Sequence, residues 1–184
     1  MTLKSFYNLP VANIMPVSAS FDDSPKIAPL PAALAARFSG DWHVHGQGLF
    51  TWSVFRVYRA ALHVTGEGFS DKALYALDLN YLRNVSAEQI AQTSVEEMQR
   101  IAGVDAATAE RWGELLLGIL PDVKLGDRLI GVFEPGVGVA FFGREGALGE
   151  IADPAFVHAF GAVWLDEQTR APGLRAKLLG LEQS

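Results

Sequence analysis

Hydrophobic and polar positions alternate along two stretches of the chain, residues 42–64 and 73–82. The first stretch has few turn residues after Gly48 and is rich in Val, Phe, Trp and Thr, so we expect strands there. Its alternation places two sets of side chains on opposite faces: Thr51, Ser53, Phe55 and Val57 against Trp52, Val54, Arg56 and Tyr58. In the second stretch the same rule sets Tyr75, Leu77, Leu79 and Tyr81 against Leu74, Ala76, Asp78 and Asn80.

Five other stretches carry the signals of helices. Residues 31–38 predict a short helix, and apolar residues recur at helical spacing in the longer stretches that follow. The longer helices are expected to begin at recognisable start signals, namely Ser86 with Gln89, Asp105, Asp153 with Pro154, and Pro172. Pro121 and Gly180 predict the ends of the second and the last of these four helices.

Between the second and third long helices the pattern returns to strands. Residues 128–133 and 137–142 are apolar, and Pro135-Gly136 between them is typical of a type II turn. Strands and helices are therefore segregated along the chain and do not alternate. This order predicts an α+β fold, in which helices cover one face of an antiparallel sheet.

Composition limits the domain organisation and the classes of partner. The chain has 184 residues, 49% of them hydrophobic, which suits one domain with a substantial core. We expect that domain over residues 31–184, after an irregular N-terminal arm, residues 1–30. The net charge of −6, with scattered Lys and Arg, argues against a nucleic-acid partner. No apolar run approaches the length of a transmembrane helix, and the chain has no cysteine for disulfides or thiolate sites.

The first 19 residues contain some features of an export signal. Lys4 is an early basic residue, and small residues suited to a signal peptidase follow at Val17-Ser18-Ala19. Asn and Pro residues interrupt the apolar segment that a signal peptide needs. The sequence thus favours a cytoplasmic location over a periplasmic one.

Two distant segments resemble parts of one family pattern. The first, residues 46–62, begins Gly46-Gln-Gly48, and the second, residues 126–165, begins Gly126-Asp127-Arg128 and ends Trp164-Leu165. Together they are similar to the bacterial branch of the chalcone isomerase-like family. The resemblance implies a large curved antiparallel sheet with helices against it and a ligand cleft between the two layers. Separately, a dinucleotide-binding loop at Gly46-Gln-Gly48 is improbable, because a strand follows and the third glycine of that motif is missing.

The resemblance implies an altered reaction site. Plant enzymes of the family close a chalcone into a flavanone, and an arginine stabilises the developing negative charge. That arginine would fall on Phe50 here, which carries no charge and donates no hydrogen bond. Ser53 matches the position of a threonine that lines the plant cleft. We therefore assign no catalytic residue.

Four residues are the candidates for the ligand site: Phe50, Ser53, Arg56 and Tyr81. Arg56, like Arg59 and Arg83, lies in or beside an apolar strand and would suit a carboxylate if it entered the cleft. The alternative is a surface arginine paired with Asp78 or Glu67, and we favour that alternative by about two to one.

Other polar clusters favour structural roles. His43, His45 and His63 allow a metal site, but strand-edge histidines are the commoner outcome, so we expect no metal and no cofactor. Glu96 and Glu97 are adjacent on a helix and are expected to be solvated charges. The large aromatic residues are expected in the core more often than in a pocket.

Three functions remain open. The first is a binder of a small hydrophobic or fatty-acid-like ligand in the cleft, without chalcone isomerase activity. The second is an intramolecular lyase or isomerase, acting on an enone or phenolic substrate, with a different cation such as Arg56. The third is a scaffold whose cleft is filled by its own side chains. The sequence leaves the ligand and the oligomeric state open.

Overall fold

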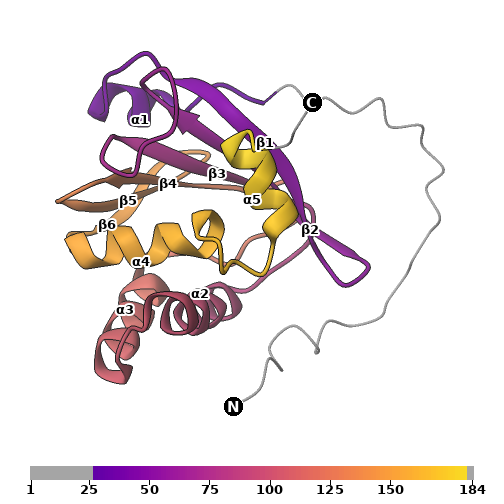
Figure 1. Cartoon of the computed structure of the whole chain (residues 1–184), viewed down its shortest axis with the longest axis vertical. Coiled ribbons are helices and arrows are strands. Elements are labelled where there is room, and N and C mark those ends of the chain that lie inside the picture. The colour runs from indigo at the N-terminus through magenta and orange to yellow at the C-terminus, as the bar shows by residue number, and fades with distance from the viewer. Residues whose placement is uncertain (1–26, 182–184) are drawn as a thin grey trace.

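The protein, seen in a computed structural model that describes residues 27–181, is built on one six-stranded antiparallel sheet (Figure 1). Each strand pairs with the next along the chain, in the order β1 to β6. The strands are β1 (His43–Trp52), β2 (Phe55–Val64), β3 (Tyr75–Tyr81), β4 (Arg128–Glu134), β5 (Gly138–Gly143) and β6 (Gly146–Ile151). The predicted α+β fold with an antiparallel sheet is confirmed.

Four helices form a layer on one face of the sheet. They are α2 (Ala87–Ala102), α3 (Ala106–Ile119), α4 (Pro154–Leu165) and α5 (Pro172–Leu179). In Figure 1, α4 crosses in front of the sheet, and α2 and α3 lie below it. The core between the two layers contains buried residues such as Leu77, Phe133 and Phe160. This layer is the helical cover that the sequence predicts.

The opposite face of the sheet also has a cover, which the sequence analysis did not predict. The short helix α1 (Ala32–Arg37) packs there, and its Leu34 is fully buried. Leu34 and the following Phe38 form a second apolar cluster with β-strand residues such as Ile130 and Phe142. Both faces of the central strands are therefore buried.

Under this second cover lies a buried ionic cluster. Arg128 donates two hydrogen bonds to the carboxylate of Asp78, at 2.8 and 2.7 Å, and Nε2 of His63 donates a third, at 3.1 Å. Arg128 also donates to the backbone carbonyls of Ala28 and Pro29. Asp78 is fully buried. The sequence-based alternative, in which Asp78 pairs at the surface with Arg56, Arg59 or Arg83, is therefore wrong, because its arginine partner is Arg128. Arg128, 50 residues away, reaches it because β3 and β4 are neighbours.

The helix starts agree with the sequence-based expectations because caps are local interactions. Ser86 and Gln89 form the complete capping box of α2. The side chains of Asp105 and Asp153 cap α3 and α4, and α5 ends at Gly180. None of these depends on residues far along the chain.

The hairpin between β1 and β2 differs from the expected alternation. Ser53 and Val54 form its turn, and Ser53 takes a left-handed conformation with φ 55°. The turn resets the alternation, so residues 51–58 do not share faces as predicted. Neither turn residue is a glycine, proline, asparagine or aspartate, and serine is a weaker turn signal than these.

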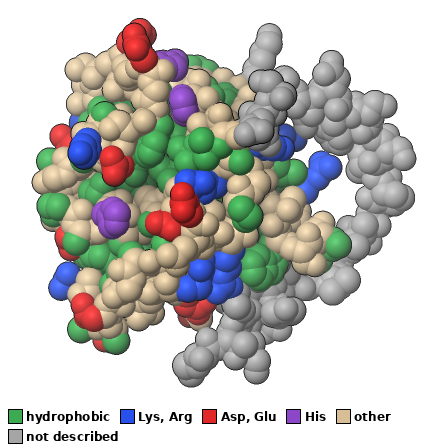
Figure 2. All heavy atoms as spheres, in the orientation of Figure 1, with side chains coloured by type: hydrophobic (Ala, Val, Ile, Leu, Met, Phe, Trp, Pro, Cys, Tyr) green, Lys and Arg blue, Asp and Glu red, His purple; other side chains and the backbone are tan. Residues whose placement is uncertain are grey.

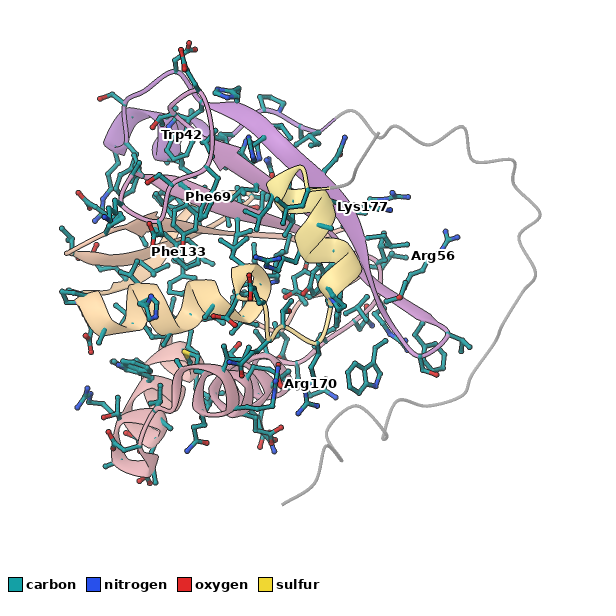
Figure 3. The ribbon with its side chains drawn as sticks, in the orientation of Figure 1. Trp42, Arg56, Phe69, Phe133, Arg170 and Lys177 are labelled. Atoms are coloured by element: carbon teal, nitrogen blue, oxygen red, sulfur yellow. The ribbon has the colours of Figure 1, made fainter. Side chains whose placement is uncertain are left out.

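The glycine pair at the start of the family pattern lets α5 lie directly on β1. A Cβ atom at Gly46 would collide with backbone carbonyl oxygens of Lys177 and Leu178, and one at Gly48 would lie 2.8 Å from Cδ1 of Leu174. Figure 3 shows α5, with Lys177 labelled, across the β1 strand. Gly46 and Gly48 therefore serve close packing.

Most of the predicted N-terminal arm, including the candidate export signal at residues 1–19, lies outside the described residues. The cytoplasmic location stays a prediction for that reason. Within residues 27–181, no helix is long and apolar enough to cross a membrane.

Candidate functional site

A cavity of about 130 Å³ lies between the sheet and the helical layer. Apolar side chains from five strands, from α2 and α4 and from the segment before α2 form most of its walls, among them Val57, Leu77, Leu79, Val85, Ile90, Leu129, Phe133, Phe141, Phe160 and Val163. Its lining follows β3 from Tyr81 to Leu77, a distance of about 13 Å at the usual rise of a strand. The cleft is therefore elongated along the strands.

The accessible side chains in the lining show where the cavity opens. Trp52, Thr93 and Glu96 are half-buried, and Arg170 is exposed, whereas Phe133 is fully buried. The mouth thus lies between the β1–β2 end of the sheet, α2, and the loop that joins α4 to α5. Figure 2 shows acidic and basic side chains interspersed on the face of these helices, without a broad basic patch.

An aromatic cluster lies at one end of the cavity. The ring of Phe50 stacks on that of Tyr58, with centroids 4.9 Å apart and planes at 21°. Tyr58 meets Tyr81 edge to face at 5.6 Å, and its hydroxyl oxygen accepts a hydrogen bond from Nε1 of Trp164 at 3.0 Å. Phe50, which the resemblance led us to expect in place of an arginine, therefore packs its ring against a tyrosine.

Both tyrosine hydroxyls of this cluster stay protonated. Burial raises the pKa of Tyr58 far above its ordinary value, and the hydrogen bond from Trp164 offsets only part of that effect. Burial also raises the pKa of Tyr81, and the neighbouring Tyr58 raises it further. At neutral pH the cavity thus presents two neutral phenols, which donate hydrogen bonds and carry no charge.

A buried glutamate with two arginines borders the mouth. Glu97 is 8% exposed, and Arg100 donates to both of its carboxylate oxygens, at 3.2 and 2.6 Å. Nε of Arg170 lies 2.8 Å from the same carboxylate, which ties the α4–α5 loop to α2 (Figure 3). The expectation that Glu97 is a solvated charge is wrong, because the loop folds over it. Glu96 accepts a hydrogen bond from Gln92.

Two other hydroxyls of the lining, those of Ser94 and Thr169, are bonded to the backbone. The hydroxyl of Ser94 donates to the carbonyl of Ile90 at 2.7 Å, and that of Thr169 donates to the carbonyl of Val163 at 2.8 Å. They stabilise local structure and are less available to a ligand than the tyrosines.

The structure brings two of the four candidate residues into the cavity. Phe50 and Tyr81 line it, whereas Ser53 and Arg56 do not. Ser53 is in the exposed hairpin turn, and Arg56 is exposed near the start of β2, where Figure 3 shows it pointing outward. Arg83 lies over the ring of Phe55, 4.7 Å from its centroid, and is also outside the lining.

Several lining residues were not found from the sequence. Tyr58 was assigned to a strand face without a role, and Trp164 to a helix core. Antiparallel pairing of β2 with β3 could have identified Tyr58, because it places Tyr58 directly opposite Tyr81. Arg170 had no such signal, because its place depends on the path of the α4–α5 loop.

No metal site is evident in the part of the chain that the structure describes, where no three His, Cys, Asp or Glu side chains gather. His63 is bound to Asp78 on the far side of the sheet from the cavity. His43 is exposed, and its Nδ1 contacts the carbonyl of Asp41.

A sequence profile described as chalcone isomerase-like matches residues 33–180. The chain belongs to the chalcone isomerase-like family. Among solved structures, this family member is similar to a fatty-acid-binding protein of Arabidopsis thaliana, with a TM-score of 0.60 and 8% sequence identity. The match covers 75% of this chain and 86% of the plant chain, and at that identity it shows a shared fold alone. No curated protein matches the sequence.

Proposed function

We propose that this chalcone isomerase-like protein binds a small hydrophobic or fatty-acid-like ligand in the cavity between sheet and helices. The observation that carries the proposal is an apolar cavity with an accessible mouth and a few polar groups at one end. Binding sites for small molecules commonly have this composition. The fatty-acid binding of the structurally similar plant protein supports the same reading.

The size of the cavity limits the ligand. An engineered cavity of about 150 Å³ in another protein binds benzene, so about 130 Å³ suits one ring or a slender chain. A longer ligand would have to extend through the mouth past Thr93 and Arg170. We therefore favour ligands with a single ring or a medium-length acyl chain.

A displacement assay tests binding. A fluorescent fatty acid should bind wild-type protein, and decanoate should displace it. Arg56→Ala should leave both affinities unchanged, because Arg56 is not in the cavity lining. Absence of saturable binding would contradict the proposed function and favour a scaffold. If Arg56→Ala bound the fatty acid more weakly than wild type, the carboxylate headgroup would have to lie outside the cavity, beside β2.

We expect no chalcone isomerase activity. The isomerase alternative needs a cation in the cleft, but Phe50 occupies the position of the family's arginine, and Arg170 is engaged by Glu97. Loss of one fixed charge stabiliser typically lowers an enzymatic rate by about 10²–10³. The absorbance of naringenin chalcone should therefore decay at the spontaneous rate with or without the protein. A rate clearly above that background would favour the isomerase.

A further inference from the structure

We propose that the tip of the β1–β2 hairpin, residues 51–56, docks the protein on membranes that contain anionic lipids. The tip joins exposed apolar side chains to neighbouring cations, which is the composition of segments that lie in a membrane interface. The inference goes beyond the proposed function and does not depend on it, because membrane docking and ligand binding are measured separately.

The hairpin extends past the neighbouring strand of the sheet. Residues 51–56 pair only within the hairpin, because the pairing of β2 with β3 begins at Tyr58. At the usual rise of a strand, Phe55 lies about 10 Å beyond Tyr58. Figure 1 shows the β1–β2 hairpin projecting from the body of the protein. Its reach matches the depth of about 5–10 Å to which interfacial segments enter a bilayer.

The projecting tip exposes apolar side chains. Val54, in the turn, is 84% exposed, more than any other large hydrophobic side chain among the described residues. Phe55 beside it is 38% exposed, and neither residue belongs to the two core clusters. Trp52 is half-buried, and tryptophan is enriched where proteins meet the membrane interface. Exposed apolar side chains that gather on a projecting element indicate an interaction surface.

Cations surround the apolar tip. The guanidinium of Arg83 lies over the ring of Phe55, 4.7 Å from its centroid. No carboxylate among the described residues pairs with Arg83, and its Nε is buried without a hydrogen-bond partner. Arg56 and Arg59 add positive charge to the hairpin, and no acidic residue occurs in residues 42–66. A guanidinium beside an apolar tip suits the phosphate of a lipid headgroup.

The distribution of charge favours a membrane as the partner. The chain has a net charge of −6, so an anionic surface repels most of the protein and favours approach at a locally positive tip. In a two-fold dimer joined at the tips, the cations of one copy would face the same cations of the other, which disfavours a second copy. Trp52 also lines the cavity, so docking would bring the mouth of the cavity to the lipid.

Flotation of the full chain with vesicles tests the docking surface. Wild-type protein should float with vesicles of phosphatidylcholine and phosphatidylglycerol, mixed at about three to one, and less with vesicles of phosphatidylcholine alone. Val54→Glu should lower binding to the mixed vesicles by about tenfold, because it replaces an inserting apolar side chain with an anion. Arg83→Gln should lower it by about fivefold, the contribution of one basic residue near an anionic surface.

Val137→Glu is the matched control. Val137 is also a valine in a hairpin turn, 52% exposed, but its turn joins β4 to β5 at the opposite end of the sheet. This variant should bind both kinds of vesicle like wild type. Because the chain has no cysteine, Val54→Cys and Val137→Cys can each carry one environment-sensitive fluorophore. With mixed vesicles, only the label at position 54 should shift its emission to the blue.

Three results would overturn the docking surface. Wild-type protein would fail to float with the mixed vesicles, or Val54→Glu would float as well as Val137→Glu does. In the third, Val54→Glu would change the oligomeric state in size-exclusion chromatography and leave vesicle binding unchanged, which would assign the tip to a second copy. Val54→Glu should bind the fluorescent fatty acid like wild type, because Val54 is outside the cavity lining. That assay therefore decides the proposed function separately.

Discussion

Replacing Asp78 with alanine is expected to lower the free energy of unfolding by about 3–5 kcal/mol, the usual effect of removing one partner of a buried ion pair. Asp78 is fully buried and Arg128 is 9% exposed, so the variant leaves a buried guanidinium without its carboxylate. The hydrogen bond from His63 is lost as well. Urea denaturation, followed by circular dichroism, measures the change.

Arg37→Ala is the control for this variant. It removes the ion pair with Glu150, whose side chains are 48% and 51% exposed, and should change stability by at most about 1 kcal/mol. An Asp78→Ala effect as small as that of Arg37→Ala would contradict the role of the buried cluster in holding β3, β4 and the chain before α1 together.

The effect of Asp78→Ala should depend on pH. Burial alone would raise the pKa of Asp78, but hydrogen bonds and positive charge from Arg128 and His63 outweigh it and lower the pKa. The carboxylate's contribution is therefore complete above its unfolded-state pKa, about 3.9, and is lost as the pH falls through the lower folded-state value. The stability difference between wild type and Asp78→Ala should be constant near neutrality and shrink below about pH 4.

Leu79→Trp should lower ligand affinity by at least about tenfold, because it fills the binding space. Leu79 is in the middle of β3 and lines the cavity. An indole there occupies volume that one ring or an acyl chain would need. Displacement of the fluorescent fatty acid measures the loss, and denaturation in urea checks that the variant is folded, since overpacking itself lowers stability by about 1–3 kcal/mol.

Leu125→Trp is the matched control, with the same replacement at a side chain that is 68% exposed and outside the cavity lining. It should bind the probe like wild type. If folded Leu79→Trp protein bound the probe as tightly as wild type, the ligand would have to bind elsewhere on the protein.

Sequence reasoning recovered the features that local chemistry determines. The caps at Ser86, Asp105 and Asp153 depend on atoms within three residues of each cap, so their signals are complete in the sequence. The separation of strands and helices likewise followed from hydrophobic periodicity. The β1–β2 turn was missed because Ser53 is only a weak turn signal and Val54 is none.

The site was only partly predictable because its environment comes from distant segments. Glu96 and Glu97 look alike in sequence, and only the α4–α5 loop, more than 60 residues later, buries Glu97 (Gln168 lies 68 residues from Arg100). Strand alternation predicted the face of the sheet on which Asp78 lies. It did not predict that α1 and the segment before α1 bury that face. Phe50 and Tyr81 were found because the family pattern and strand alternation identify them.

A crystal structure of the protein soaked with bromobenzene tests the central claim most directly, because bromine gives an anomalous signal at its own position. The cavity account predicts one strong peak between the sheet and helices α2 and α4, in contact with Phe133, Phe141 or Phe160. The same crystals of Leu79→Trp should lack that peak. Bromine found only on the surface, or a cavity left empty at saturating bromobenzene, would contradict the account.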